Sequence, residues 1–167
     1  MAEPAIHFAV PFAAFTALGL KPELAFLFSL LALTPDLDVL FHYHRSISHS
    51  LIPWVIFTMP LLVLNWESGS VNVIILALLA LTSHILLDLT GYTPILYPIV
   101  KDSYRINVNF DMHFGSSPKF KFDLRVMSRP TTFKPIESLD AQLFTGEGLL
   151  ISLILLAPTL LSLIKRI

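Results

Sequence analysis

The stretch that decides the fold runs from Ala32 to His49 and reads ALTPDLDVLFHYHRSISH. It carries two carboxylates, three imidazoles and an arginine in a chain that is 54% hydrophobic and only 14% charged. Ionisable groups are costly within or beside a bilayer and are seldom found there without a partner or a function. We therefore interpret the rest of the chain as a scaffold that brings His7, His84 and Asp88 to this stretch.

The composition is typical of a membrane protein. A soluble domain usually carries about 25% charged residues, whereas only 14% of these 167 residues are charged and the mean hydropathy is +0.73. The length suits a single domain, 1–167. The alternative to a membrane protein is a soluble bundle of buried helices. The net charge of −1 would not attract nucleic acid, so no nucleic-acid partner is expected. Because the chain has no cysteine, any metal must be held by histidines and carboxylates.

Five apolar segments predict membrane helices, at about 5–20, 23–42, 50–66, 71–90 and 148–164. Several fall short of the ~20 residues that a full span needs, so we expect thin, tilted or broken helices. Glu3 stands where a signal peptide would carry positive charge, so the first segment is expected to be a helix of the protein. Thr34-Pro35 predicts a break in the second segment, because Thr caps helices and Pro suits their first position. Broken backbone at membrane depth mainly lines a cavity or faces protein, which directs attention to Asp36.

A β-hairpin is predicted at about 104–127, between the fourth and fifth helices. Apolar and polar residues alternate from Tyr104 to Phe114 and again from Lys119 to Val126, on both sides of a Gly-Ser-Ser-Pro turn. One face is aromatic and apolar, and the other is charged. We expect the hairpin to cover the helices; the alternative is that its apolar face rests on lipid and guides a lipid substrate. Residues 128–147 are predicted to form an irregular surface loop, so the expected fold is a mostly α membrane bundle with one inserted hairpin.

The topology brings distant polar residues to one side of the bundle. If successive helices alternate in direction, His7 starts the first helix, Asp36 and Asp38 follow the second, and His49 opens the third. His84 and Asp88 end the fourth helix, where their i,i+4 spacing places them on one face. The start of the first helix, the end of the second, the start of the third and the end of the fourth all lie on the same side of the membrane. The residues at these helix ends are therefore expected to meet.

Three histidines and up to three aspartates without cysteine match a borderline divalent ion. Zinc is the most probable ion by this donor set, with manganese or iron as alternatives, and one or two ions are expected. Magnesium prefers oxygen ligands and would rarely take so many imidazoles. The metal candidates are His7, Asp36, Asp38, His49, His84 and Asp88. Taken alone, the pair His84 and Asp88 could instead form a structural hydrogen bond or a proton relay.

The remaining polar residues of the central stretch have more than one reading. Asp38 is a ligand, a partner that orients a histidine, or a helix-start charge. Arg45 is a membrane-interface anchor or a phosphate clamp. His44, like His42, is an interfacial residue or part of the site. The candidate catalytic residues are therefore Asp36, Asp38, Arg45 and His44; outside this set, Ser46, Ser48 and Ser50 are expected to cap helices and His113 to be solvated.

The quoted motifs carry a family resemblance over about residues 1–100. An early His7, Pro35-Asp36-Leu37-Asp38, His44 to Ser50 (HRSISHS) and His84-Ile85-Leu86-Leu87-Asp88 resemble, in this order, the YdjM-type family of inner-membrane, metal-dependent hydrolases. The hairpin and the loop after it lie outside the resemblance. The resemblance implies a cell inner-membrane location, a bound divalent metal and hydrolytic activity.

The same motifs resemble, more distantly, the zinc-dependent phospholipases C and the single-strand-specific zinc nucleases. That resemblance implies that Asp36, His49, His84 and Asp88 hold one ion, and that His7 and Asp88 hold a second one, with Asp88 bridging. Only two residues could replace the third-ion ligands of those enzymes, and neither has matching spacing: His113 and Glu147. A site with three ions is therefore not expected.

The expected activity is hydrolysis of a phosphoester in a lipid or lipid-linked substrate through a metal-bound hydroxide. Asp36 or Asp38 would serve as general base, and Arg45 would hold a phosphate oxygen. A metal-binding sensor or transporter, and a purely structural subunit, are the alternatives. The positive-inside bias places the site toward the cytoplasm. The basic residues on that side are Arg45, Lys101, Arg105, Lys119, Lys121, Arg125, Arg129 and Lys134, against Lys21, Lys165 and Arg166 on the other. The sequence does not indicate an oligomeric state.

Overall fold

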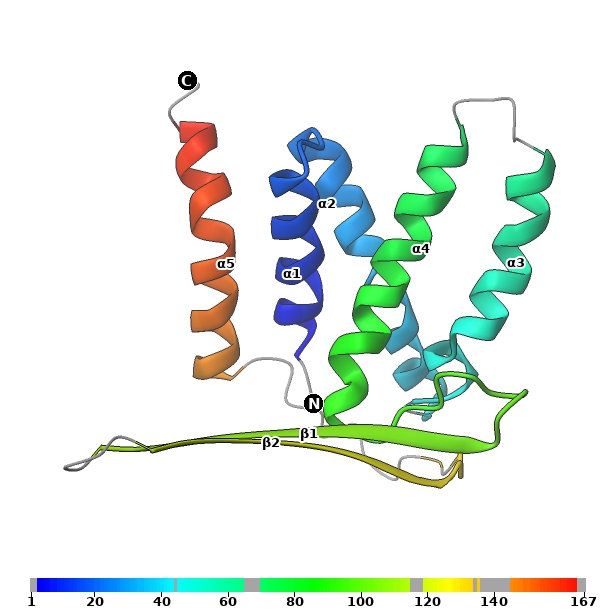
Figure 1. Ribbon diagram of the computed structural model, residues 1–167. Coiled ribbons are helices and arrows are strands. Elements are labelled where there is room, and N and C mark those ends of the chain that lie inside the picture. Colours follow the sequence, from blue (N-terminus) through cyan, green and yellow to red (C-terminus); the bar gives the residue numbers. More distant parts are fainter. Residues whose placement is uncertain are drawn as a thin grey trace.

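The computed structural model describes residues 3–43, 45–64, 70–114, 119–133, 135 and 145–164. The α-helices are α1 (Pro4–Ala17), α2 (Pro22–Leu31), α3 (Leu51–Leu64), α4 (Ser70–Leu87) and α5 (Gly146–Ile164). The short 3-10 helices are η1 (Thr34–Phe41), η2 (Ile47–His49) and η3 (Asp88–Thr90), and the strands are β1 (Asp102–His113) and β2 (Lys119–Pro130). Figure 1 shows the α-helices standing beside one another while the hairpin runs across their lower ends. The mostly α fold with a hairpin between the fourth and fifth helices is thus confirmed.

Local sequence signals place the helix ends. Pro4 and Pro22 start α1 and α2, where the missing amide hydrogen costs nothing. After α1, Gly19 takes a left-handed φ of 88°, and the amide of Leu20 donates to the carbonyl of Phe15 at 3.0 Å. This glycine-ended cap satisfies the last carbonyls of the helix. It also turns the chain back into α2, so that α1 and α2 run antiparallel.

The predicted break in the second segment is present. Helix α2 ends at Leu31, and the chain continues as the 3-10 helix η1 with Pro35 near its start. The tighter 3-10 winding projects Asp36 and Asp38 from a short segment instead of from a regular helix face. Helix η1 ends at Phe41, and the next residue, His42, has a left-handed φ of 59°; Arg45 is left-handed as well, with a φ of 57°. These two reversals direct the chain back toward the start of α3.

Helix α1 packs against α2, α4 and α5, around a small core. The buried core residues are Phe12, Phe15, Ala25, Ala32 and Ala80. At the start of α1, Glu3 accepts hydrogen bonds from the amide (2.7 Å) and the hydroxyl of Thr145, which ties α1 to the beginning of α5. The small core leaves most apolar side chains on the outside of the helices.

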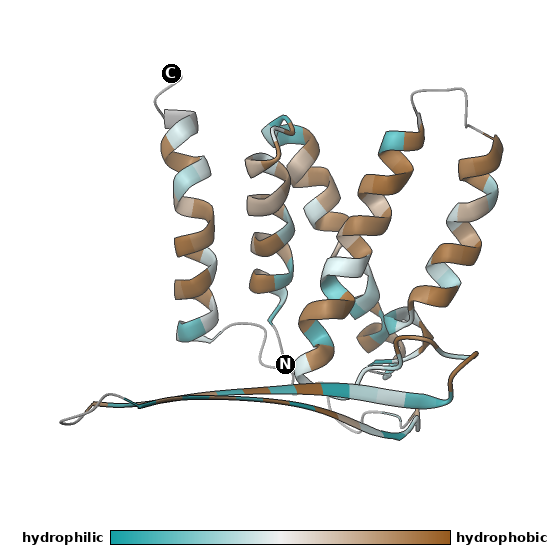
Figure 2. Cartoon of the chain, in the orientation of Figure 1, coloured by the Kyte–Doolittle hydropathy of each residue, from teal (hydrophilic) through white to brown (hydrophobic). Residues whose placement is uncertain are grey.

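Two stretches of the described chain are helical, long and apolar enough to cross a membrane, judged by length and composition alone. They are Pro22–Phe41, which includes the break, and Val71–Thr90. The other apolar helices are shorter: Pro4–Ala17, Leu51–Leu64 and Gly146–Ser162. Figure 2 shows the helices mostly in brown, with hydrophilic colour mainly toward their ends. The five predicted helices therefore exist, but only two have the length expected of a span.

The hairpin is longer than predicted and covers little of the bundle. Its strands pair antiparallel from Asp102 opposite Pro130 to His113 opposite Lys119, so the predicted surface loop begins after Pro130. The sequence predicts that loop from 128 to 147, and its residues 134 and 136–144 lie outside the described chain. Phe110 and Phe122 face each other in the far half of the hairpin and are 60% and 64% exposed. The prediction that the hairpin covers the helices is therefore wrong for this far half.

Candidate metal centre

Four chain segments bring one side chain each to the lower end of the bundle. Asp36 comes from η1, His49 from η2, His84 from the last turn of α4, and Asp88 opens η3. One ligand atom of each lies within 4.8 Å of the others. The predicted convergence of residues from the second, third and fourth segments is therefore present in the structure.

The spacing of these atoms fits four ligands around one small cation. The Nε2 atoms of His49 and His84 lie 3.3 Å apart. Oδ1 of Asp36 is 3.4 Å from the first of these and 3.5 Å from the second. Asp88 approaches His49 Nε2 at 3.4 Å through Oδ2. Ligands held about 2.0–2.1 Å from a tetrahedral ion are about 3.3–3.4 Å apart, and these four contacts match that spacing, while the ligand atoms of all four groups lie within 4.8 Å of one another.

The charges of the cluster also fit a divalent cation. Three carboxylates meet here, on Asp36, Asp38 and Asp88, and their side chains are only 23%, 7% and 2% exposed. Arg45 is the one arginine in contact with them. With neutral histidines the cluster would carry two uncompensated negative charges, which is costly away from water. Either a divalent ion or protons on the histidines must compensate them.

Asp38 lies behind His49 and holds its second ring nitrogen. Its Oδ2 is 3.2 Å from His49 Nδ1 and accepts hydrogen bonds from the amide of Ser46 (2.9 Å) and the hydroxyl of Ser48 (3.0 Å). A carboxylate in this place fixes the ring and leaves Nε2 directed at the cluster. Of the three roles predicted for Asp38, the geometry supports the partner that orients a histidine.

The carboxylates set the charge of His49. Burial lowers its pKa, but hydrogen bonds from the ring to Asp36, Asp38 and Asp88 outweigh burial and raise the pKa to about 10. In the absence of a metal ion, His49 would therefore be a cation shared by three aspartates. A metal ion would have to replace that proton, since only the neutral imidazole can be a ligand.

Arg45 binds both carboxylate oxygens of Asp88, the same two that approach His49 and His7. Its Nε lies 3.2 Å from Oδ2 and its Nη2 lies 3.4 Å from Oδ1 of Asp88. Gly91 makes this position possible, because a Cβ there would lie 1.7 Å from Arg45 Nη1. Arg45 thus holds the candidate ligand Asp88 in place. This role differs from both predicted roles of Arg45, the membrane-interface anchor and the phosphate clamp.

His7 joins the cluster at its edge. It is fully buried, its Nε2 lies 3.5 Å from Asp88 Oδ1, and its ring stacks on His84 with 3.8 Å between centroids. Its Nδ1 and that of His84 have no hydrogen-bond partner within the described chain. His7 therefore belongs to the predicted site, but it is not one of the four groups that share one centre.

The other candidate residues lie apart from this centre or outside the described chain. His44 is among the residues outside it. Ser46 caps η2 by accepting the amide of Ser48, as predicted. His113 is exposed at the far end of β1, as expected for a solvated residue. Sequence reasoning missed Gly91, since a glycine after a helix reads as an ordinary stop signal.

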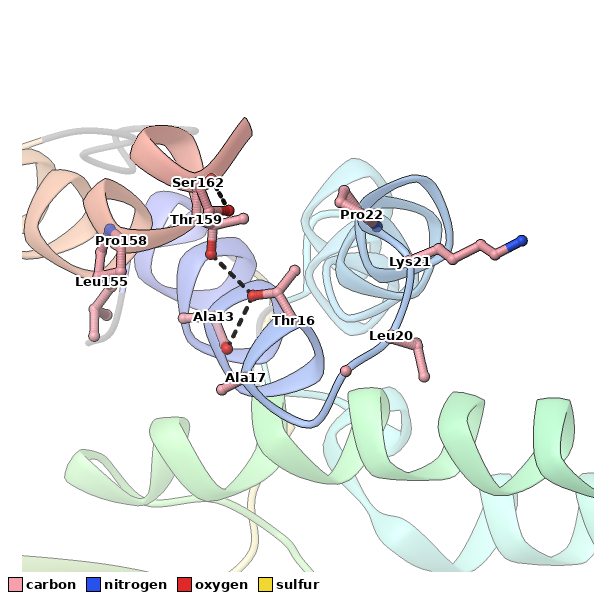
Figure 3. Close-up of a pocket in the computed structure, with 11 residues that line it drawn as sticks. Ala13, Thr16, Ala17, Leu20, Lys21, Pro22, Leu155, Pro158, Thr159 and Ser162 are labelled. Carbon is pink, nitrogen blue, oxygen red and sulfur yellow. Dashed lines mark hydrogen bonds between the residues drawn. The ribbon is translucent and has the colours of Figure 1, made fainter. Parts of the chain in front are cut away.

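A cavity of about 520 Å³ lies at the opposite end of the bundle, between α1, α5 and the α1–α2 turn. Figure 3 shows the hydroxyls of Thr16 and Thr159 bonded across it at 3.0 Å, while the Lys21 side chain extends away from them. Thr16 also donates to the carbonyl of Phe12 at 2.8 Å, so its hydrogen-bonding capacity is used within the protein. The ionisable groups of the metal cluster lie far from this cavity, which therefore offers no comparable chemistry.

Comparison with known proteins identifies a family. A family model described as YdjM inner membrane protein matches residues 1–128, which include all of the cluster and β1. No curated protein and no solved structure matches the chain. The more distant resemblance to zinc-dependent phospholipases C and nucleases therefore stays a prediction.

Proposed function

The chain belongs to the YdjM inner membrane protein family, and on this premise we propose that it is a membrane-embedded, metal-dependent hydrolase. Its substrate is the phosphoester of a lipid or of a lipid-linked molecule. The observation that carries the proposal is the four-membered cluster of Asp36, His49, His84 and Asp88, with neighbouring ligand atoms 3.3–3.5 Å apart.

The donor set favours zinc over the other candidate ions. Two imidazoles and two carboxylates without a thiolate suit zinc, while manganese and iron prefer more ligands. When bound, such an ion would need to hold a water in addition to the four protein groups; it would lower the pKa of that water and neutralise charge on phosphate oxygens. The two negative charges left by Asp36, Asp38, Asp88 and Arg45 are the matching counter-charge.

The protein residues have distinct roles in this proposal. Arg45 fixes both oxygens of Asp88, and Asp38 fixes the His49 ring through Nδ1. Asp36 is the most exposed carboxylate of the three, and it faces His49 and His84 through Oδ1 and not through Oδ2. That oxygen is placed to accept a proton from an attacking water, so we assign the general base to Asp36. Asp38 is less suited to be the general base, because its Oδ2 already accepts hydrogen bonds from Ser46 and Ser48.

The position of the cluster favours an interfacial substrate. The cluster lies at the lower helix ends, beside the hairpin (Figure 1). If α2 to α4 and their neighbours cross the bilayer, as their apolar surfaces favour, this end lies near headgroup depth. A phosphate headgroup could then reach the site while its acyl chains stay in lipid. The excess of basic residues on this side supports an orientation of the site toward the cytoplasm in a multi-pass arrangement.

A metal-binding sensor or transporter is the second candidate. A transporter needs a site that both sides of the membrane can reach, typically near the midplane. The cluster instead occupies one end of the described bundle, and at the other end the hydroxyls of Thr16 and Thr159 are bonded to each other. This asymmetry favours the hydrolase.

The test is hydrolysis by purified protein of a phospholipid panel, after chelation and reloading with zinc or manganese. We expect metal-dependent release of headgroup or phosphate that is lost in the double variant His84→Ala/Asp88→Ala and retained in the control His113→Ala. Turnover that survives the double variant would overturn the mechanism. A tightly retained ion without turnover on any phosphoester would favour the sensor, and an ion lost on simple dialysis would favour the transporter.

A further inference from the structure

The far half of the hairpin presents a continuous apolar surface. Eight large apolar side chains share one face of the two strands there, and each is between 46% and 79% exposed. They are Val108, Phe110, Met112, Phe114, Phe120, Phe122, Leu124 and Val126. Cross-strand neighbours such as Phe110 and Phe122 lie directly opposite each other, so the surface is one patch. Exposed patches of this kind mark a contact with lipid or protein.

The near half of the hairpin is fixed to the bundle. Backbone hydrogen bonds of 2.9 Å join Thr93 and Tyr104 in both directions. Arg129 lies over the ring of Tyr92 with its guanidinium carbon 4.0 Å from the centroid, and Ser103 is bonded to Thr131 at 2.9 Å. The far half extends from this base beyond the lower end of α5 (Figure 1). Its direction is thus set by the fold, across the lower ends of the helices (Figure 1).

The apolar surface of the helices reaches down to the level of the hairpin. Leu86 near the end of α4, Leu150 in the first turns of α5 and Phe41 at the end of η1 are all exposed. In an inner membrane protein these side chains require lipid around the lower helix ends. The far half is seen edge-on in Figure 1, so one of its faces is turned toward that lipid and the other away.

The opposite face of the far half is polar and charged. It carries Asn107, Asn109, Asp111, His113, Lys119, Lys121, Asp123 and Arg125, with three cations against two carboxylates. Asp123 and Arg125 form an ion pair of 2.8 Å on this face. A two-faced strand pair with an aromatic side and a slightly basic side matches the boundary between acyl chains and anionic headgroups.

We propose that the far half of the hairpin is an interfacial arm that lies on the bilayer. Its apolar face enters the boundary of headgroups and acyl chains in the leaflet next to the metal cluster, and its charged face is turned to water. The occupant of the apolar face is the lipid bilayer itself. The arm fixes the depth of the cluster and its rotation relative to the membrane plane. This assignment does not depend on the hydrolase activity.

The absence of cysteine allows a direct test with single spin labels. Phe122→Cys and Leu124→Cys report on positions of the apolar face, and the matched control Lys121→Cys reports on the charged face of the same strand. The full-length labelled proteins are placed in vesicles of phosphatidylcholine and phosphatidylglycerol. Accessibility to oxygen, which partitions into lipid, is compared with accessibility to a water-soluble nickel chelate.

We expect labels at 122 and 124 to lie about 5–10 Å below the phosphate level, while the label at 121 is reached by nickel and lies outside the bilayer. Two outcomes would overturn the proposal. Nickel access at all three positions would leave the apolar face in water. Protection of 122 and 124 from both oxygen and nickel would show protein on that face, such as a second copy of the chain. An unchanged circular-dichroism spectrum and thermal unfolding transition in each variant show that the bundle is folded.

Discussion

The metal cluster and the far half of the hairpin depart from the usual distribution of residues in opposite directions. In the cluster, ionisable side chains such as His49 and Asp88 are buried. In the hairpin, aromatic side chains such as Phe110 and Phe122 are exposed. Buried charge needs partners inside the protein, whereas exposed apolar surface needs a partner outside it. The contrast therefore separates a site suited to binding a ligand from a surface suited to contact with the membrane.

Among the variants that test this contrast, Asp88→Asn is expected to have the largest effect on metal affinity. Asp88 faces His49 at 3.4 Å, and the amide keeps its size but loses its charge. Structural zinc sites bind with about 10–16 kcal/mol, so losing one of four ligands should weaken binding by roughly 100-fold to 1000-fold. Elemental analysis after dialysis should find about one ion per chain in the parent and almost none in the variant.

The matched control is Asp111→Asn on the charged face of the hairpin, where the side chain is exposed. It makes the same chemical change away from the cluster and should keep the full metal content. A full ion in both proteins would show that Asp88 is not a ligand. No ion in either would show that the cluster is a hydrogen-bonded network without a metal, and His49 would then be its cation.

A smaller effect is expected from Asp38→Asn. Asp38 contacts His49 at Nδ1 and not at the Nε2 atom that faces the other ligands, so the variant keeps all four proposed ligands while weakening the support of one ring. Changes to such supporting groups typically cost 10-fold to 100-fold in metal affinity. Competition with a chelator of known affinity measures the difference. A loss as large as that of Asp88→Asn would mean that Asp38 is itself a ligand.

Gly91→Ala tests whether the grip of Arg45 on Asp88 matters. The new methyl group would occupy the place of the guanidinium, 1.7 Å from Nη1, and a flexible arginine can move away. We expect about a tenfold loss of metal affinity with little loss of stability, at the lower limit for a supporting group. Gly146→Ala is the control, since nothing lies within 4 Å of its added Cβ. Unchanged affinity would leave Arg45 without a role in positioning Asp88.

Much of the site was predictable because its residues sit at signals that sequence reveals. Thr34-Pro35 marks the break that frees Asp36, and the i,i+4 spacing of His84 and Asp88 marks one helix face. The alternation of helix directions then brings Asp36, His84 and Asp88 to the end of the bundle where His49 lies, just before α3. These inferences need only local sequence and the rule that successive membrane helices reverse.

Other features depend on contacts that no local pattern encodes. Gly91 matters because Arg45, 46 positions earlier, fills the space beside it. Arg45 reaches that space through a left-handed φ of 57°, which an arginine rarely adopts. The far half of the hairpin was expected to cover the helices because alternation predicts two faces but not what lies against them. Its direction is set by distant contacts such as Thr93 with Tyr104.

The smallest effect on stability and metal affinity is expected from the double variant Phe110→Ser/Phe122→Ser. This variant tests the hairpin side of the comparison. These rings already expose 60% and 64% of their surface, so little packing within the protein is lost. Their cross-strand contact is worth under about 1 kcal/mol. Because the pair shares no contact with the cluster, additivity predicts unchanged metal affinity. Thermal unfolding and chelator competition in detergent measure both quantities. A clear loss of metal would mean that the two regions are coupled, and the arm would then belong to the site instead of merely orienting it in the membrane.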